Sequence, residues 1–290
     1  YGHWRGDGIA VDMMLMEESM DSAFGAVPTS GLAGQELKSV QAPIANNESD
    51  DYSQTNIQVE GVDEADIIKT DGTYLYIVRY DGIKIVKARP ADDMEIIGTL
   101  TFDDDSFSPT SVYIEDGRLI VLGTTSVEIH RPVGILDRMV GSPSYYPSYS
   151  NRTKVAIYDV SDPSNPEEIR SLAFEGREIS SRKIGDTLYL VMNQSLNTFP
   201  HPYAETDDND VLPVYRDSAE GTEDMPVSLC SDVVILPRVP SPQYLLVAAI
   251  PTDDADGSVS LETVLGNGDN VYMSLNNLYV ANTEWNYIWN

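Results

Sequence analysis

From residue 56 onward, apolar residues occur in short alternating runs separated by turn signals, and helical periodicity is almost absent. The run "TYLYIV" (73–78) follows the pair Asp71-Gly72 and is itself followed by "IKIVKA" (83–88). Alternation with a period of two indicates strands with one buried face, and an Asp-Gly pair beside such runs is typical of tight β-hairpins. This part of the chain is therefore predicted to be all-β.

One phrase recurs four times along this region: a strand, a polar two-residue turn and a second strand rich in aromatic or aliphatic residues. The copies are "IIKTDGTYLYIV" (67–78), "SVYIEDGRLIVL" (111–122), "SRKIGDTLYLVM" (181–192) and "VYMSLNNLYVAN" (271–282). Recurring four-stranded units of about 40 residues or more are typical of β-propeller blades. A β-sandwich would also contain many short strands, but it does not predict the same phrase at the start of each unit.

The predicted fold is an all-β β-propeller of four-stranded blades, with about three and a half blades in this chain and an incomplete ring. A short, partly helical N-terminal segment is expected to precede it, because "GIAVDMMLMEESMDSAFG" (8–25) has apolar residues compatible with one amphipathic helix. The predicted divisions are an N-terminal segment and linker at 1–55, a propeller domain at 56–290, and within it blades at about 63–105, 108–176 and 177–266 with the start of a further blade at 267–290.

The charge balance limits the partners of this protein. The chain has 47 acidic and 18 basic residues and a formal net charge of -29, which repels phosphate backbones and anionic membrane surfaces, so nucleic acid is not an expected partner. Such acidity fits a halophilic or mineral-rich extracellular setting, and it equally fits carboxylate-rich loops that bind divalent cations. No apolar run approaches the length of a membrane span. The single cysteine, Cys230, excludes an internal disulfide and is expected to be a small buried apolar residue.

An acidic segment, "QVEGVDEAD" (58–66), stands directly before the first copy of the phrase. One interpretation is a crossover loop between blades, in which the Asp side chains accept hydrogen bonds from nearby backbone groups. The other is a Ca²⁺ site near the propeller axis, where a cation would offset the repulsion between carboxylates. The candidate metal ligands in this segment are Asp63, Glu64 and Asp66.

A long insertion (198–226) interrupts the third unit, and loops of this length are usually functional or disordered. Asp207, Asp208 and Asp210 offer closely spaced oxygen ligands suited to Ca²⁺, although a solvated acidic loop explains them equally simply. The later stretch "TDDADGSVSLE" (252–262) partly matches a calcium loop but lacks flanking helices, so a hairpin turn is expected there. Ca²⁺ is thus the one cofactor that the sequence suggests.

Other loops carry candidate surface sites. Tyr145, Tyr146 and Tyr149 lie among prolines and could stack on sugars or contact a protein partner, or they could simply cover the blade beside them. Sequons for glycosylation of an exported protein occur at Asn47, Asn151 and Asn193. No nucleophile elbow, zinc-protease motif, P-loop or dinucleotide fingerprint occurs, so no catalytic residue is assigned.

The segment "TNIQVEGVDEADIIKTDGTYLYIV" (55–78) closely resembles the hallmark of a family of secreted archaeal and bacterial proteins whose β-propeller domain is distantly related to WD repeats. Further similar segments lie at 212–218, 230–250 and 266–282, so the resemblance covers about residues 52–282. It implies an exported, extracellular or surface-attached protein with a propeller fold and no assigned activity. Members of the family are longer than this chain, so the missing blades are expected to come from the rest of the polypeptide or from another chain.

Three hypotheses follow for the function. The leading one is a non-enzymatic extracellular propeller that acts as a binding or scaffold module for a protein or glycan at the cell surface, stabilised by Ca²⁺. The second is a polysaccharide hydrolase or lyase with acid and base carboxylates at the propeller axis, since sequence spacing does not reveal such pairs. The third is a structural subunit of a surface layer or filament, in which a neighbouring chain completes the ring.

Overall fold

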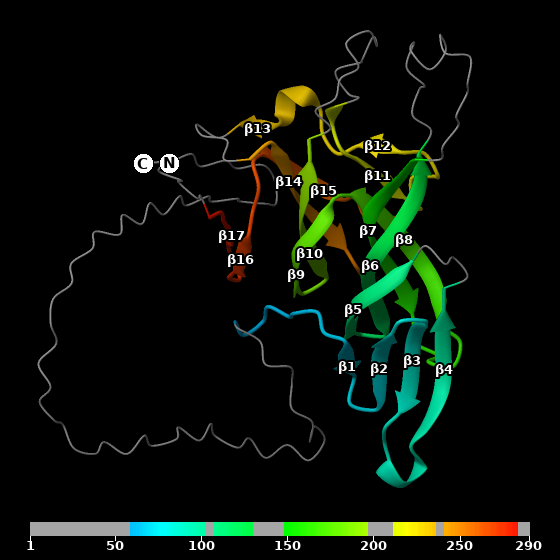
Figure 1. The fold of residues 1–290 in the computed structure, drawn as a ribbon. Helices are drawn as coiled ribbons and strands as arrows, with labels where there is room; N and C mark the ends of the chain where they lie inside the picture. Colours follow the sequence, from blue (N-terminus) through cyan, green and yellow to red (C-terminus); the bar gives the residue numbers. More distant parts are fainter. Residues whose placement is uncertain (1–58, 103–106, 130–147, 197–210, 236–240, 284–290) are drawn as a thin grey trace, which may run out of the picture.

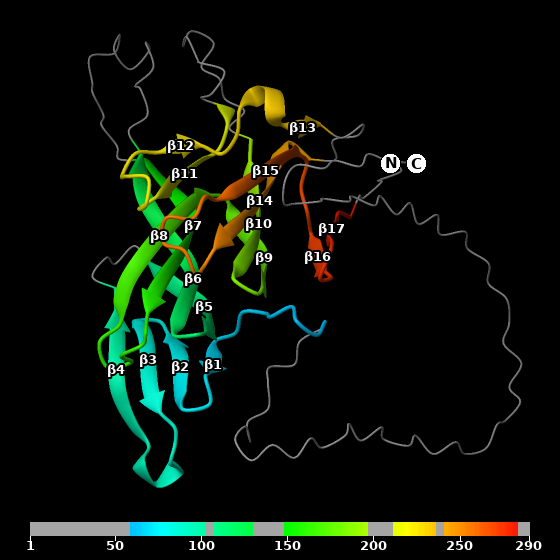
Figure 2. The ribbon, with the colours of Figure 1, turned by 180° about the vertical axis from the view of Figure 1, so that it is seen from behind.

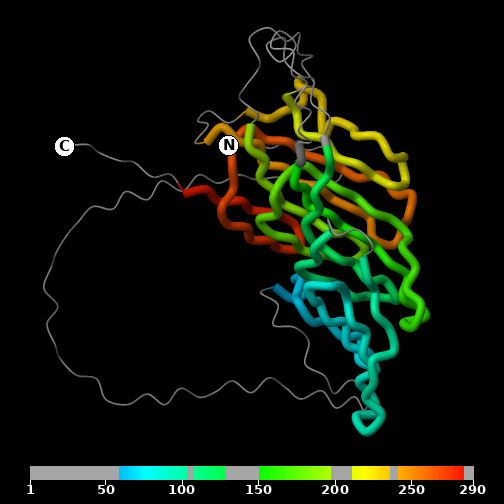
Figure 3. The backbone as a smooth tube through the Cα atoms, turned by 45° about the vertical axis from the view of Figure 1, so that its right-hand side comes forward, coloured from blue at the N-terminus to red at the C-terminus, as the bar shows by residue number. Residues whose placement is uncertain are grey.

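The computed structural model describes residues 59–102, 107–129, 148–196, 211–235 and 241–283, and within them the chain forms four successive sheets, antiparallel except for one short parallel edge strand (Figure 1). The sheets follow one another along an arc, in the order of the sequence (Figure 3). This is the arrangement of blades in a β-propeller, and the ring is not closed. The predicted all-β propeller fold is confirmed, whereas the predicted N-terminal helix lies outside the described residues.

The first three sheets are complete blades, and the fourth contributes two strands. Blade 1 has the order β1-β2-β3-β4, blade 2 has β5-β6-β7-β8 extended by β11 and β12, blade 3 has β9-β10-β14-β15 extended by β13, and blade 4 has β16-β17. The strands are β1 (Ile68–Thr70), β2 (Tyr74–Arg79), β3 (Gly82–Lys87), β4 (Glu95–Thr101), β5 (Ser108–Glu115), β6 (Arg118–Ile129), β7 (Ser148–Asp159), β8 (Glu167–Glu175), β9 (Arg177–Ile184), β10 (Thr187–Ser195), β11 (Val214–Asp217), β12 (Met225–Pro226), β13 (Val234–Ile235), β14 (Gln243–Pro251), β15 (Ser260–Leu265), β16 (Asn270–Met273) and β17 (Leu278–Ala281).

The recurring phrase of the sequence forms the first two strands of each sheet. In blade 2 its turn residues, Asp116 and Gly117, have φ angles of 46° and 74°, as a type I′ turn between β5 and β6 requires. Such a turn matches the right-handed twist of the strands that it joins, and Asp and Gly tolerate positive φ better than other residues. A two-residue turn therefore sets the register of the first two strands in blades 2 and 3. In blades 1 and 4 the expected two-residue turn is wrong, because four residues separate the last paired positions, Thr70 with Leu75 and Met273 with Leu278.

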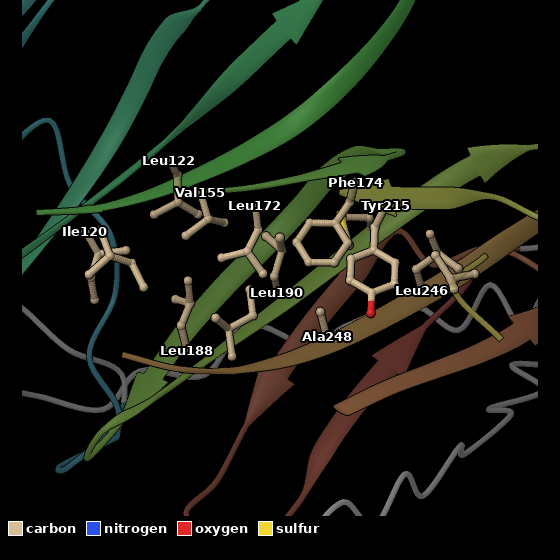
Figure 4. Packing of buried hydrophobic residues seen from close by; sticks show 14 of the residues in the cluster. Ile120, Leu122, Val155, Leu172, Phe174, Leu188, Leu190, Tyr215, Leu246 and Ala248 are labelled. Carbon is tan, nitrogen blue, oxygen red and sulfur yellow. The ribbon is translucent and has the colours of Figure 1, made fainter. Parts of the chain in front are cut away.

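Hydrophobic clusters fill the spaces between successive sheets. Between blades 2 and 3, aliphatic side chains from both sheets interdigitate, and the ring of Tyr215 stacks on Phe174 with centroids 5.5 Å apart (Figure 4). Similar clusters join blade 1 to blade 2 and blade 3 to blade 4. Burial of apolar side chains on both faces of the middle sheets provides the main driving force for stacking the blades.

The insertion in the third unit extends the neighbouring blade. It supplies β11, which pairs antiparallel with β8, and β12, which pairs with β11, so the sheet of blade 2 has six strands (Figure 2). The chain after the insertion then adds β13 parallel to β15 at the outer edge of blade 3. The described part of the connection between β10 and β14 thus covers the outer edges of two blades, which would otherwise expose unpaired backbone groups.

A buried ion pair fixes this extension. The Arg170 guanidinium donates to both carboxylate oxygens of Asp217, at 3.0 and 2.5 Å, and both side chains are almost fully buried. The remaining guanidinium nitrogen donates to the carbonyl oxygen of Gly257 at 2.7 Å and to that of Asp254 at 3.4 Å. Arg170 therefore ties together β8, β11 and the turn between β14 and β15. In the stretch 252–262, which partly matches a calcium loop, the backbone carbonyls of Asp254 and Gly257 therefore bind the Arg170 guanidinium.

A second arginine cluster lies on the same extension. Arg152 of β7 donates to both oxygens of Asp224, at 2.6 and 2.8 Å, and Arg216 of β11 approaches the same carboxylate at 3.0 Å. The two arginines hold the pKa of Asp224 below its ordinary value, chiefly through the hydrogen bonds from Arg152. The segment that leads into β12 is thereby held on the blade.

The expectation that Cys230 is a small buried apolar residue is wrong. Cys230 is exposed, at the start of a short 3-10 helix (Cys230–Asp232) that follows β12. The apolar run that follows this helix, around β13, packs at the outer edge of blade 3, and Cys230 itself lies on the connection rather than in a strand.

No described helix is long and apolar enough to cross a membrane.

Breaking the Arg170–Asp217 pair should destabilise the protein strongly. In Arg170→Met, the Asp217 carboxylate remains buried without its partner, and we expect the free energy of unfolding to fall by about 3–5 kcal/mol. Urea unfolding followed by circular dichroism measures this change. Arg118→Met, which removes the partly exposed Arg118–Asp159 pair, is the matched control and should cost far less. Equal losses in the two variants would contradict the role given to the buried pair.

Candidate functional site

The acidic segment crosses the first strands of the blades. The Asp63 N–H donates to the Lys183 carbonyl of β9 at 2.8 Å, and the Lys183 N–H donates back at 3.0 Å. Three residues later, Asp66 exchanges the same pair of hydrogen bonds with Val112 of β5, at 3.2 and 2.8 Å. The chain then enters β1. Residues 62–66, here named the axial strap, therefore bind the inner strands of blades 3 and 2 before the inner strand of blade 1 begins.

The start of the strap is anchored in the hydrophobic interface between blades 3 and 4. Val62 is 2% exposed and packs in the cluster that includes Val191, Leu245 and Leu278. The preceding Gly61 has a φ of 83° and lies against Leu275 of blade 4, so a side chain at this position would be strained. One short segment thus contacts all four blades.

Each predicted carboxylate of the strap has its own partner. An oxygen of Asp63 accepts hydrogen bonds from Lys69 Nζ at 2.7 Å and from the Glu64 N–H at 2.8 Å. Glu64 pairs with Arg182 at 3.4 Å, and Asp66 accepts a hydrogen bond from the Ile67 N–H at 2.7 Å. The structure supports a crossover segment with capped turns.

No metal centre is built by these carboxylates in the described structure. Among the described residues, no three His, Cys, Asp or Glu side chains converge in a way that could hold a metal ion. Calcium binding by Asp63, Glu64 and Asp66 stays a prediction that this geometry does not favour, because lysine and arginine supply the positive charge beside two of them.

Buried polar groups continue the network behind the strap. The Tyr113 hydroxyl of β5 donates to Ser181 Oγ of β9 at 3.0 Å, and Lys69 Nζ lies 5.8 Å from the centre of the Tyr113 ring. Ser181 in turn hydrogen-bonds the carboxyl group of Glu178. These contacts join the inner strands of blades 1, 2 and 3 through side chains as well as through the backbone.

Burial sets the proton affinities of this network. Desolvation raises the pKa of the Tyr113 hydroxyl, and desolvation likewise raises the pKa of Glu178, against the opposing effect of its hydrogen bond with Ser181. Desolvation lowers the pKa of Lys183, whose ammonium pairs with Glu115 and donates to the Gly185 carbonyl at 2.5 Å. The network therefore combines paired charges with one partly buried carboxyl group whose pKa is raised.

Several sequence-predicted residues lie outside the described structure. These are Asp207, Asp208 and Asp210 of the insertion, Tyr145 and Tyr146, and the sequon residue Asn47. Tyr149 falls at the beginning of β7, but its side chain is also outside the description. The calcium, partner-surface and glycosylation hypotheses at these positions stay predictions.

The two described sequon residues have different environments. Asn151 is exposed on β7, opposite Ser126. The Asn193 side-chain amide instead donates to the Gly268 carbonyl at 2.8 Å and accepts from the Gly268 N–H at 3.0 Å. It thus pairs with the Gly268 backbone as a neighbouring strand would, and it links blade 3 to the segment that leads into blade 4. Sequence reasoning missed this structural role, because residues 75 positions apart gave no local signal. Glycosylation at either residue stays a prediction.

The fold and its axial network define a class of protein: a β-propeller domain whose inner strands are joined by a polar strap. The family model described as "Beta propeller domain" matches residues 52–290, and the chain belongs to this family. It is 26% identical over 256 residues to an uncharacterized protein of Archaeoglobus fulgidus, covering 82% of this chain and 33% of that protein. It is also 27% identical over 150 residues to an uncharacterized protein of Methanocaldococcus jannaschii, covering 52% of this chain and 18% of that protein.

The chain therefore spans about a third or less of the length of these two curated relatives. Neither relative has an assigned function. No solved structure matches the chain.

The partly buried Glu178 carboxyl should make stability depend on pH. Its pKa in the folded protein is raised above the ordinary value, so the folded state binds more protons than the unfolded state just above that value. The free energy of unfolding should therefore fall as pH rises through this window, and Glu178→Gln should remove that loss. Urea unfolding between about pH 4 and pH 8 tests this expectation.

The control for this prediction is Glu95→Gln, which changes an exposed carboxylate on β4. We expect Glu95→Gln to leave the pH dependence as it is in the parent protein, whereas Glu178→Gln should become relatively more stable toward pH 8. The same pH profile in the Glu178 and Glu95 variants would contradict a raised pKa for Glu178.

Proposed function

We propose that this protein is a non-enzymatic binding or scaffold module that works outside the cell. The observation that carries the proposal is the pairing within the axial network: Lys69 with Asp63, Arg182 with Glu64 and Lys183 with Glu115. Acidic and basic groups that neutralise one another stabilise the inner strands, and they leave no activated nucleophile or paired acid and base among themselves. The network is suited to hold blades in fixed positions for contacts made elsewhere.

An extracellular or cell-surface location is supported by charge and by composition. A net charge of -29 favours solubility in concentrated or mineral-rich media, where added salt screens self-repulsion. Asn151 offers an exposed sequon on β7. The partner proposed for this location is a protein or a glycan, and nucleic acid is disfavoured by the same negative charge.

The tyrosine-rich segment with Tyr145, Tyr146 and Tyr149 provides a direct test of binding. We expect the purified chain to bind members of a panel of soluble cell-envelope polysaccharides, and Tyr145→Ala/Tyr146→Ala to weaken that binding by about tenfold, because stacked rings contribute about 0.5–1.5 kcal/mol each. Isothermal titration calorimetry measures the affinity. Tyr80→Ala is the matched control, since Tyr80 is 88% exposed on a turn of blade 1. Unchanged affinity in the double variant would contradict a glycan-binding role for this loop.

Calcium is included in the proposal as a stabiliser of the acidic insertion. We expect millimolar Ca²⁺ to raise the melting temperature of the parent chain by a few degrees, and chelator to reverse the shift. The triple variant Asp207→Asn/Asp208→Asn/Asp210→Asn should lose the response, while Asp63→Asn should keep it, because Asp63 already pairs with Lys69. An unchanged melting temperature on addition of chelator would remove calcium from the proposal.

A second candidate function is hydrolysis or lysis of a polysaccharide, which the environment of Glu178 favours. Desolvation raises the pKa of the Glu178 carboxyl group, and a raised carboxyl pKa is a feature expected of a general acid. Incubation with the same polysaccharide panel, followed by detection of reducing ends or unsaturated products, distinguishes the two functions. Product release that is lost in Glu178→Gln would establish the enzyme, and absence of product with retained binding would support the binding module.

A further inference from the structure

The outer edge of blade 1 differs from the outer edges of blades 2 and 3. In blade 2 the fourth strand, β8, pairs with β11, and in blade 3 the fourth strand, β15, pairs with β13. Both added strands pair with the C-terminal part of the fourth strand, at residues 172–174 and 264–265. In the described part of the chain, no strand pairs with the outer edge of β4 in blade 1 (Figure 1). An edge of this kind offers backbone N–H and C=O groups to an extended chain.

The strands β4 and β8 share an irregularity that fixes how their backbone groups are directed. A bulge leaves Ile169 of β8 without a paired residue on β7, and a bulge leaves Ile97 of β4 without a paired residue on β3. Counted from these two bulges, Thr99 of β4 corresponds to Ser171 of β8. Because inward and outward backbone groups alternate along an edge strand, the two edges present their outward groups in the same register.

Ser171 shows how such a position binds an added strand. Its carbonyl oxygen accepts a hydrogen bond from the Ser218 N–H at 2.9 Å, and its own N–H donates to Ser218 Oγ at 2.9 Å. By correspondence, the N–H and C=O groups of Thr99 point away from β3. Thr99 and Thr101 are both exposed. The C-terminal part of β4 is therefore equivalent to the part of β8 that binds β11.

Apolar side chains beside this edge suit an incoming strand. Met94 is 58% exposed and Ile96 is 64% exposed, so a chain laid along β4 would bury aliphatic surface. Phe102, the residue after β4, corresponds to Phe174, on which Tyr215 of the added strand β11 stacks. Strand addition at β4 would thus combine backbone hydrogen bonds with apolar contacts.

The charges at the start of β4 indicate what kind of strand would bind. Asp92 and Asp93 lie in the exposed 3-10 helix that precedes β4 (Ala91–Asp93), and Glu95 is exposed at the first position of the strand. These carboxylates attract a cationic chain. They disfavour a second copy of this protein, whose net charge is -29.

We propose that the outer edge of β4 binds an extended, basic segment of a partner protein by strand addition. The segment runs antiparallel to β4, as β11 runs to β8, because the two edges share their bulge and register. In this direction the C-terminal part of the segment lies beside Asp92, Asp93 and Glu95. Its lysines or arginines therefore follow an alternating apolar stretch that pairs with Thr99 and Thr101.

This inference goes beyond the glycan-binding function proposed above, because it concerns a backbone edge and a peptide partner. Failure of the polysaccharide panel would leave the strand-addition proposal intact. Failure of the peptide test below would leave glycan binding intact. The two results are therefore distinguishable.

Two fluorescein-labelled peptides of identical composition test the proposal. They are acetyl-VYTVTKK-amide and acetyl-KKVYTVT-amide, and fluorescence anisotropy at low ionic strength measures their binding to the 290-residue chain. Non-specific attraction to an acidic protein is the same for both peptides. We expect the peptide with C-terminal lysines to bind about threefold or more tightly than the other, because only its lysines reach the carboxylates at the start of β4. Equal affinities, the reverse order or no binding of either peptide would overturn the proposal.

Variants of the carboxylates test the direction of the bound segment. Asp92→Asn/Asp93→Asn/Glu95→Gln should remove the difference between the two peptides. Glu220→Gln/Glu223→Gln is the matched control, since it neutralises exposed carboxylates after β11 and should keep the difference. A difference that persists in the triple variant would show that the lysines do not lie at the start of β4, contrary to the proposal.

A proline at the edge tests the backbone pairing. Thr99→Pro removes an outward N–H at an edge position, where proline is tolerated, and we expect it to weaken peptide binding by about tenfold. Thr99→Val keeps the N–H and should bind the peptide as the parent chain does. Circular dichroism checks that both variants are folded. Unchanged binding by folded Thr99→Pro would contradict strand addition, and if this variant does not fold, the triple carboxylate variant decides.

Discussion

The hydrogen bonds of the axial strap are the constraint on which the arrangement of the blades depends. Each inner strand has a free edge on the side that faces away from its own blade, and buried backbone groups on that edge need partners. Asp63 satisfies Lys183 on β9, and Asp66 satisfies Val112 on β5, before the same segment continues into β1. Because residues 63–66 hydrogen-bond the inner strands of blades 3 and 2 and then continue into the inner strand of blade 1, they fix the spacing of three blades at once.

The acidic composition of the strap follows from the neighbours that it meets. Lys69 and Lys183 have side chains only 5% and 4% exposed, and a buried ammonium is costly unless a carboxylate or carbonyl oxygen lies beside it. Asp63 of the strap supplies an oxygen to Lys69, and Glu115 of β5 supplies one to Lys183. Two of the carboxylates that looked like metal ligands in the sequence, Asp63 and Glu64, therefore pair with Lys69 and Arg182, which the first strands of blades 1 and 3 contribute.

Local sequence predicted the blades well, and it failed where distant segments meet. The alternating strands and the short turns that join them are determined by neighbouring residues, so the propeller fold was predictable from the repeated phrase. The pairing of β11 with β8 was not predictable, because Val214–Asp217 lies within the third unit and joins the second. The hydrogen bond between the Asn193 side chain and the Gly268 backbone was not predictable either, because these residues are 75 positions apart in the sequence. The run "LPVYRDS" did carry a weak signal, since its alternation is that of a strand.

The distribution of basic residues connects the stability of the fold with the character of its surface. Within the described residues, five basic side chains are mostly buried and paired with carboxylates: Lys69, Arg152, Arg170, Arg182 and Lys183. Each such pair is neutral, so the net charge of -29 is carried by the remaining residues. Salt screens repulsion between exposed carboxylates far more than it screens buried pairs. The same chain can therefore keep its internal ion pairs in concentrated salt, while the repulsion between its exposed carboxylates becomes weaker.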